Sequence, residues 1–162
     1  MKTLISLFFL TSIWCIGPEL SKVRSAYREA SSNEKAVMTL YEDLASVGQK
    51  DDVRLVAYKG AVTTMMAKYV EEIKDKKTFF KDGRELLEFA ITTKPEDVEL
   101  RCIRLSVQEN APKIVGYKKN ITEDKQFILD HFSSVTETGA KEFIRGYIQK
   151  SKTFSEAEKQ LF

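Results

Sequence analysis

The stretch that most constrains the fold runs from Arg84 to Tyr117, where two helical patterns meet at Lys94-Pro95. Apolar residues recur at helical spacing before this point, which predicts a helix starting at an Asp82-x-x-Glu85 capping box. Because Pro95 disfavours helical geometry at Lys94, this helix should end just before Lys94, and a second helix should begin at Pro95 and end at Ala111-Pro112. The second helix has a wide apolar face, so we expect neighbours to cover it on two sides.

The residues around this turn resemble a known helical repeat. Ala90 precedes Pro95 by five positions, and Glu96 to Arg101 follow it; this resembles the second helix and inter-repeat turn of tetratricopeptide-like helical hairpins. Tyr58-Lys59-Gly60-Ala61 is similar to the small-residue contact in the first helix of such a repeat. About thirty residues separate Gly60 from Ala90, where the family repeat has roughly twenty, so one helix or linker is longer than in the family.

The resemblance implies an all-α fold in which antiparallel helical hairpins stack as a short α-α superhelix, and we expect seven to eight helices. The pattern from Glu99 to Gly116-Tyr117 also resembles small secreted bacterial proteins, which implies an exported chain. A chain of 162 residues favours one domain. The net charge is only +2 and the basic residues are scattered, which argues against nucleic acid as a partner.

The N-terminus predicts export. Met1-Lys2 is followed by an almost wholly apolar run from Thr3 to Gly17, which has the length of a signal peptide and is short for a permanent membrane span. We therefore expect a signal peptide at residues 1–17, a single helical domain at residues 18–162, and a periplasmic or secreted location after cleavage. A lipid anchor at Cys15 and a buried N-terminal helix remain alternatives.

Further elements follow from apolar periodicity and capping signals. We expect one helix after Pro18, one from Ser31-x-x-Glu34 to Gly48, and the longest from Val53 to about Ile73 after Asp51-Asp52. The cluster Lys74 to Lys77 is the best linker candidate, and Phe79 and Phe80 should turn into the core. Three more helices are expected, and their start signals are Asn120-x-x-Glu123, Gly139 and Ser155-x-x-Glu158.

Candidates for chemistry are few. Without the signal peptide, Cys102 is the only cysteine and lies on an apolar helix face, so we expect a core side chain. His131 is the only histidine, so a second imidazole for a catalytic pair or a His/Cys metal site is missing. The sequence therefore predicts no enzyme, no cofactor and no metal.

The strongest binding candidate is the stripe Arg101, Arg104 and Gln108, which lie three and four residues apart on an otherwise apolar helix. Facing a groove, these guanidinium groups could bind a peptide carboxylate, with Tyr58 and Arg54 from the preceding long helix beside them. The alternative is structural ion pairing, with Asp97 four residues before Arg101 or with the loop from Asn110 to Tyr117.

We therefore expect a non-enzymatic module that binds a protein or peptide in the bacterial cell envelope and touches the membrane only through its export segment. The alternative function is a small helical carrier that holds an apolar ligand between its helices. The residues that suggest this carrier are Met65, Met66, Phe79, Phe80 and Phe127.

Overall fold

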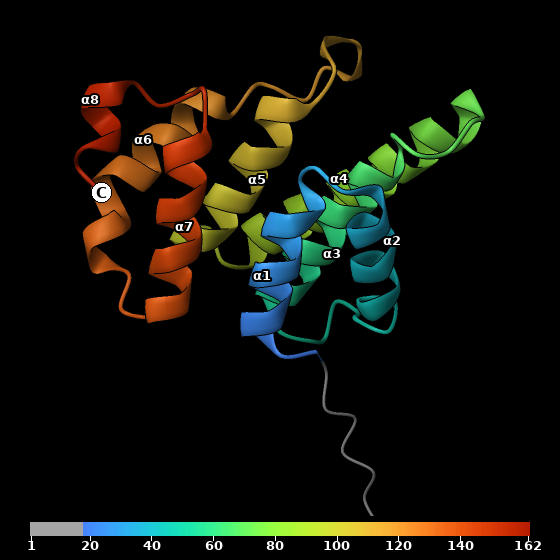
Figure 1. Ribbon diagram of the computed structural model, residues 1–162, viewed down its shortest axis with the longest axis horizontal. Helices are drawn as coiled ribbons and strands as arrows, with labels where there is room; N and C mark the ends of the chain where they lie inside the picture. The colour runs from blue at the N-terminus through green and yellow to red at the C-terminus, as the bar shows by residue number, and fades with distance from the viewer. Residues whose placement is uncertain (1–17) are drawn as a thin grey trace, which may run out of the picture.

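The protein is all-α, as the sequence predicted. The computed structural model describes residues 18–162, and the predicted signal peptide lies outside the described residues. Within that range the chain forms eight α-helices: α1 (Leu20–Ala30), α2 (Glu34–Asp43), α3 (Val53–Met66), α4 (Ile73–Thr93), α5 (Val98–Asn110), α6 (Ile121–His131), α7 (Thr138–Lys150) and α8 (Glu156–Lys159). Two 3-10 turns, η1 (Lys113–Val115) and η2 (Phe132–Ser134), follow α5 and α6 (Figure 1).

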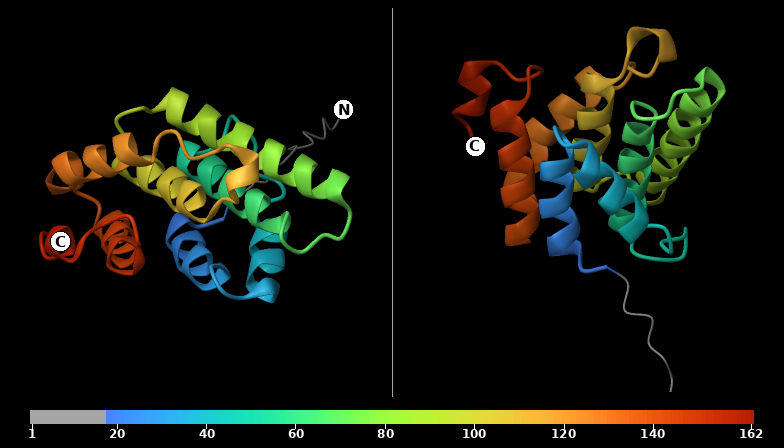
Figure 2. Two further views of the ribbon diagram at one scale, coloured as in Figure 1. Left: turned by 90° about the horizontal axis from the view of Figure 1, so that it is seen from above. Right: turned by 45° about the vertical axis from the view of Figure 1, so that its right-hand side comes forward.

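The odd-numbered helices form a ring at the centre of the molecule. α1 packs on α3, α3 on α5, α5 on α7, and α7 returns to α1. All four run in the same direction, while α2, α4 and α6 run back along the outside of the helix that precedes each of them (Figures 1 and 2). As a result, the N-terminal ends of α3, α5 and α7 meet at one end of the molecule.

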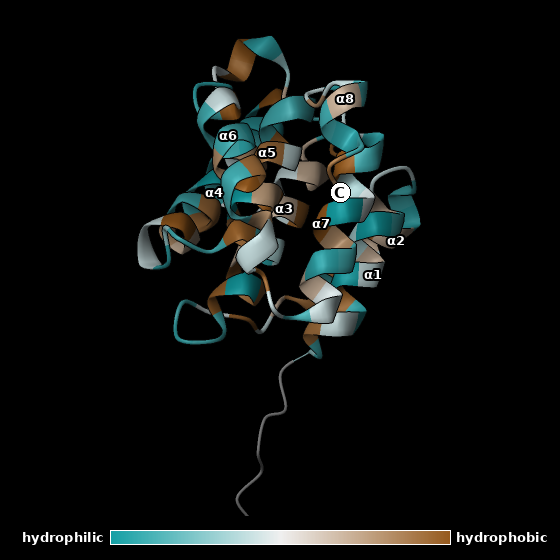
Figure 3. Cartoon of the chain, turned by 90° about the vertical axis from the view of Figure 1, so that its left-hand side faces the viewer, coloured by the Kyte–Doolittle hydropathy of each residue, from teal (hydrophilic) through white to brown (hydrophobic). Residues whose placement is uncertain are grey.

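The core lies inside this ring. Tyr27 of α1, Tyr58 of α3 and Phe143 of α7 are buried, and their rings meet edge-on or tilted with centroids 5.2 to 6.1 Å apart. Such aromatic arrangements add to the stabilisation from apolar burial itself. In Figure 3 much of α7 and α8 is coloured as hydrophilic, and the buried apolar side chains of the other helices pack into one core.

α5 is the most enclosed helix. Every residue from Val98 to Gln108 is buried, because α3, α4, α6 and α7 all pack against it. Cys102 lies in this core as predicted, and burial raises the pKa of its thiol well above the ordinary value. The helix ends at Asn110, before Ala111-Pro112, also as predicted.

α3 and α4 cross at two glycines, and their backbones touch. A Cβ built on Gly60 would lie 2.7 Å from the carbonyl oxygen of Gly83, and one built on Gly83 would lie 2.6 Å from the backbone nitrogen of Thr64. Gly60 was predicted to permit a close neighbour; its partner Gly83 was not identified from the sequence. Only residues without a side chain fit at this crossing.

The boundary between α3 and α4 differs from the prediction. α3 ends at Met66, not near Ile73, and the expected linker Lys74 to Lys77 is the first turn of α4. α4 continues without interruption to Thr93, so it is the longest helix, and the predicted capping box Asp82-x-x-Glu85 lies in its interior. The extra length of α4 agrees with the wide spacing between Gly60 and Ala90.

Several smaller predictions were also wrong. Asn33, not Ser31, caps α2 by accepting a hydrogen bond from the Ala36 N–H, and α2 ends at Asp43, well before Gly48. α5 begins at Val98, because Asp97 is its N-cap and Pro95 lies in the preceding turn. Gly139 is the second residue of α7 and does not separate two helices.

The predicted end of α4 at Thr93 and the Ser155-x-x-Glu158 capping box of α8 are confirmed. Asn120 is the N-cap residue of α6, although its side chain does not cap the helix backbone. Phe79 and Phe80 are half-buried, against Tyr41 and Tyr117 respectively. No helix of residues 18–162 combines the length and apolar character that a membrane span requires.

Candidate functional site

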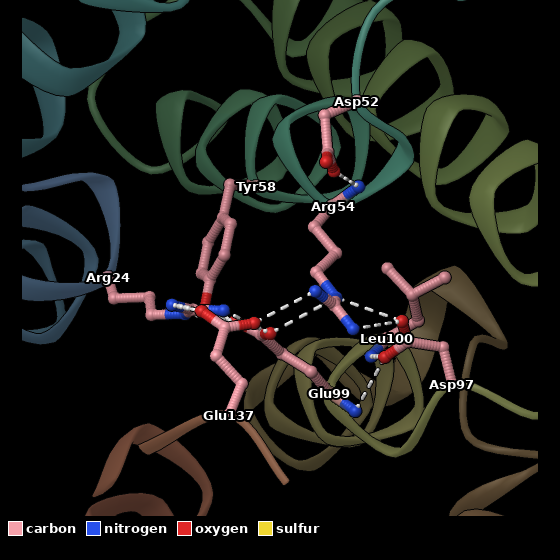
Figure 4. A network of polar contacts seen from close by, with 8 residues as sticks. All are labelled: Arg24, Asp52, Arg54, Tyr58, Asp97, Glu99, Leu100 and Glu137. Carbon is pink, nitrogen blue, oxygen red and sulfur yellow. Dashed lines mark hydrogen bonds and ion pairs between the residues drawn. The ribbon is translucent and has the colours of Figure 1, made fainter. Parts of the chain in front are cut away.

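The N-terminal ends of α3, α5 and α7 are joined by ion pairs that run from the interior to the surface (Figure 4). We call these residues the helix-end network: Arg24, Arg54, Asp97, Glu99 and Glu137, with the Tyr58 hydroxyl. Four helices contribute, since Arg24 comes from α1 and Glu137 immediately precedes α7. Two guanidinium groups therefore face three carboxylates. The hydrogen bonds between these opposite charges compensate for the hydration that each group loses on burial.

Glu99 is the centre of this network. Its side chain is almost fully buried, and its Oε1 accepts hydrogen bonds from Arg24 Nε at 2.7 Å and from the Tyr58 hydroxyl at 2.8 Å. Its Oε2 accepts from Arg24 Nη2 at 2.8 Å and lies 3.3 Å from Arg54 Nε. The Glu99 hydrogen bond raises the pKa of Arg24, and burial together with the Glu99 charge raises that of Tyr58.

Asp97 connects the network to the start of α5. Its Oδ1 accepts the backbone N–H groups of Glu99 and Leu100 at 3.0 and 3.3 Å, which caps the helix. Its Oδ2 accepts from Arg54 at 2.8 to 2.9 Å. Asp97 was expected as a partner of Arg101, but this acidic side chain binds Arg54 on the neighbouring helix.

Glu137 closes the network at the surface. It accepts a hydrogen bond from Arg54 Nη1 at 3.0 Å through Oε2 and forms a close ion pair with Arg24 through Oε1. The hydrogen bond from Arg24 lowers the pKa of the Glu137 carboxyl, so it is charged at neutral pH. Its side chain is still 46% exposed, in contrast to 1% for Glu99. Glu137 is therefore the network carboxylate with most access to an incoming group.

An open pocket of about 480 Å³ lies beside Glu137 and Arg54. Its walls are the α4–α5 turn with the first residues of α5 (94–99) and the stretch before α7 (134–137), together with Arg54 and Ala140. Pro95, Val98 and Val135 supply apolar surface, while Lys94 and Glu96 are exposed charges at the turn. The pocket can therefore take a side chain with both apolar and charged parts.

The predicted stripe residues lie elsewhere, on the face of α5 that packs against α6. Arg104 forms two hydrogen bonds with the buried carboxylate of Asp124, at 2.7 Å from Nε and 2.6 Å from Nη2. Its Nη1 bonds Glu88 at 3.1 Å, and the Tyr117 hydroxyl donates to the same carboxylate. Arg104 is buried, so its guanidinium group does not face a groove.

Arg101 is satisfied in the same way. Its Nη1 bonds Glu123 at 2.7 Å and Asp124 at 3.0 Å, and its Nε bonds the backbone carbonyl of Pro95 at 3.0 Å. The guanidinium also lies over the Phe127 ring, 4.8 Å from its centroid. Structural ion pairing, the alternative considered for this stripe, describes both arginines, but the partners are on α4 and α6 instead of at Asp97 or in the loop after Asn110.

Gln108 is fully buried at the other end of the stripe. Its Nε2 donates weakly to Asn120 Oδ1 at 3.4 Å, and its Oε1 has no hydrogen-bond partner among the described residues. The five predicted residues thus fall into two groups on opposite sides of α5. Arg54 and Tyr58 belong to the helix-end network, and Arg101, Arg104 and Gln108 bind α6 or its N-cap.

The remaining candidates do not form a second site. His131 is exposed, stacks on Phe127, and its Nδ1 contacts the Phe127 carbonyl oxygen at 2.9 Å. Phe79, Phe80 and Phe127, three of the residues that suggested an apolar carrier, contact Tyr41, Tyr117 and Arg101 in separate parts of the molecule. Residues 18–162 contain no group of His, Cys, Asp and Glu placed to hold a metal.

In comparisons with known proteins, no protein family, no curated protein and no solved structure matches this chain.

Proposed function

We propose that the protein is a non-enzymatic interaction module that accepts a peptide segment of a partner protein in the pocket beside Glu137. The observation that carries this proposal is the pocket itself, about 480 Å³ in volume and open to solvent, with Arg54 and Glu137 of the helix-end network in its wall. Because this network joins four helices, the pocket is held in one shape before a ligand arrives, which reduces the entropy lost on binding.

The helix arrangement supports an interaction role of the tetratricopeptide-like kind. Successive hairpins stack so that their first helices, α1, α3, α5 and α7, lie side by side in one direction. In an open stack these first helices would offer a concave binding face. Here α1 also contacts α7, and Tyr27, Tyr58 and Phe143 fill the space between them. We therefore assign peptide binding to the helix ends and not to the inner face.

The pocket chemistry suits a basic side chain with an aliphatic stem. A carboxylate can accept about four hydrogen bonds, and Glu137 accepts from two donors within the protein. Four carboxylates (Glu96, Asp97, Glu99 and Glu137) line the pocket, against the two cations Arg54 and Lys94. A lysine stem can lie along Val98 and Val135 while its ammonium group reaches Glu137. In the exported chain that the sequence predicts, such a partner would be in the cell envelope.

A nuclear magnetic resonance titration tests this proposal. The probe is the blocked peptide acetyl-Ala-Lys-Ala-amide, compared with acetyl-Ala-Glu-Ala-amide. We expect the lysine peptide to shift the backbone amide signals of Glu96, Thr136 and Glu137 more than the glutamate peptide does. Thr136→Trp places a large ring at the exposed pocket wall and should abolish these shifts, while Thr122→Trp, at an exposed position of α6 outside the pocket, should not.

Equal shifts with both peptides, or shifts spread over the whole surface, would contradict the proposed site. Unchanged binding by Thr136→Trp would also exclude it, provided that this variant gives the same dispersed spectrum as the unmodified protein.

A further inference from the structure

Two isoleucines at the other end of the molecule are exposed to a degree that folding does not explain. Ile114, in the middle of η1, is 94% exposed, and Ile73, the first residue of α4, is 70% exposed. η1 follows the C-terminal end of α5, and α4 begins after the C-terminal end of α3, so both residues lie at the end opposite the helix-end network. Figures 1 and 2 show η1 and the start of α4 as two separate projections.

These projections are ordered. Gly116 adopts a left-handed conformation, with φ of 63°, and its N–H donates to the Lys113 carbonyl oxygen at 3.1 Å, which closes the η1 turn. The next residue, Tyr117, is buried; its hydroxyl donates to Glu88 and its ring meets Phe80 of α4 at 6.0 Å. The turn that carries Ile114 is therefore anchored to α4 through Phe80 and Glu88.

The surroundings of Ile114 are basic, whereas those of Ile73 carry equal numbers of positive and negative charges. The stretch 112–119 holds three exposed lysines and no carboxylate, and the stretch 71–77 holds three lysines against Glu71, Glu72 and Asp75. Six lysines thus face three carboxylates around the two tips, whereas the helix-end network has more carboxylates than guanidinium groups. The end of the molecule that carries the two apolar tips is therefore basic around η1 and has no net charge around the start of α4.

We propose that this end docks on an anionic lipid bilayer, with Ile73 and Ile114 entering the interface and the lysines around η1 close to the lipid phosphates. Lysines near an anionic membrane surface each add to binding, and aliphatic side chains gain by leaving water. A protein partner would be expected to use one continuous apolar patch or pocket, not two separated tips with lysines beside them. This contact is additional to the export segment, through which alone the sequence predicted contact with a membrane.

A tryptophan placed at the tip reports docking locally. The chain has a single tryptophan, Trp14, so Ile114→Trp in a Trp14→Phe background gives one emitter at η1 in the full chain. We expect its emission to shift to the blue and to be quenched by vesicles of phosphatidylglycerol mixed with phosphatidylcholine that is brominated in its acyl chains. Leu161→Trp in the same background is the control, because Leu161 is 74% exposed and follows α8. Figure 1 shows α8 and the C-terminus on the opposite side of the molecule from the start of α4.

The charge requirement is tested on the same chain. Lys113→Gln with Lys119→Gln should weaken binding of the Ile114→Trp protein to these vesicles by roughly thirtyfold, and vesicles of the brominated phosphatidylcholine alone should not quench it. The proposal is overturned if quenching is equal at positions 114 and 161, or equal with both vesicle types. It is also overturned if no quenching is seen at position 114 or for Ile73→Trp. Ile73→Trp is also the second measurement if the position 114 variant loses its helical circular dichroism.

Discussion

Glu99 is buried, and both of its carboxylate oxygens accept hydrogen bonds from side chains of other helices. Arg24 and Tyr58, 75 and 41 residues away in sequence, bond this one carboxylate. Replacing a buried ion pair by apolar residues can leave stability unchanged, but removal of one partner leaves the other charge buried alone. Glu99 is therefore the position at which the helix-end network should be most sensitive to substitution.

We predict that Glu99→Gln lowers the free energy of unfolding by about 3–5 kcal/mol, because Arg24 loses its buried counter-charge. Urea denaturation followed by circular dichroism measures this loss. The control is Glu96→Gln, an exposed carboxylate three residues earlier, which should change stability by less than about 1 kcal/mol. Similar small losses for both variants would show that Arg24 is stabilised mainly by Glu137.

Glu137 gives the network a pH dependence. Its folded-state pKa is lowered from 4.5 by the hydrogen bond from Arg24, so its contribution to stability is complete above the unfolded-state value and is lost as the pH falls through the folded value. Hence the melting temperature of Glu137→Gln should lie below that of the unmodified protein at pH 7. The difference should begin to narrow below about pH 4.5.

Thermal melts of both proteins between pH 7 and pH 3 measure this difference. A constant gap over the whole range would mean that the Glu137 charge does not contribute to folded-state stability. Glu142→Gln, an exposed carboxylate within α7, serves as the control, because it has no ion pair in the described part of the chain and should follow the unmodified protein.

At the residue scale, the sequence identifies unusual polar side chains but not their partners. Arg101 and Arg104 were singled out because they interrupt an apolar helix, and both are indeed engaged in strong polar contacts. Their main partner, Asp124, is an acidic residue in the first turn of α6, where the helix dipole alone would explain it. Arg24 and Glu137 gave no signal either, since their meeting depends on the contact between α1 and α7.

At the element scale, the ends of helices were predictable only where the sequence contains a geometric constraint. Pro95 marked the end of α4 correctly, though not the start of α5, and the Ser155 capping box marked the start of α8 correctly. The turn between α3 and α4, by contrast, contains no Gly, Pro or Asn between Ala67 and Glu72. The helical spacing of apolar residues therefore continues through this turn, and the sequence marks no helix end there. Lys74 to Lys77 resembled a linker by charge, yet lysine is a good helix former and suits the exposed first turns of α4.

The crossing of α3 and α4 gives an element-scale prediction. Gly83→Ala should destabilise the protein by roughly 1–3 kcal/mol, because the new methyl group would press on the Gly60 carbonyl and the backbone of Thr64, neither of which can move alone. Gly146→Ala is the matched control within α7. A Cβ there would meet only Arg28 Nη1 at 3.9 Å, so the substitution should stabilise by about 0.5–1 kcal/mol.

Urea denaturation of Gly83→Ala and Gly146→Ala measures the free energy of unfolding of each variant. Equal stabilisation by the two substitutions would show that the two helices can separate at Gly83 without cost, and the close crossing would then be wrong.

At the scale of the whole molecule, closure of the ring distinguishes this fold from an open stack of hairpins. In an open stack each hairpin contacts only its neighbours, and its ends can unfold separately. Here Phe143 of α7 lies against Tyr27 of α1 and Tyr58 of α3, and Arg24 reaches Glu137. The resemblance to helical repeats predicted the hairpins but could not predict this closure, because repeat patterns describe only neighbouring units.

Closure of the ring predicts that a destabilising substitution in α7 also destabilises α1, which is far from α7 in sequence. Phe143→Ala should cost about 3–5 kcal/mol and should lower hydrogen-exchange protection in α1 as well as in α7. Phe154→Ala removes a ring that is equally buried but meets Phe162 near α8, so its effect should remain local to the C-terminal helices. Because α1 is remote from α7 in sequence, unchanged α1 protection in Phe143→Ala would show that the ends unfold independently, as in an open stack.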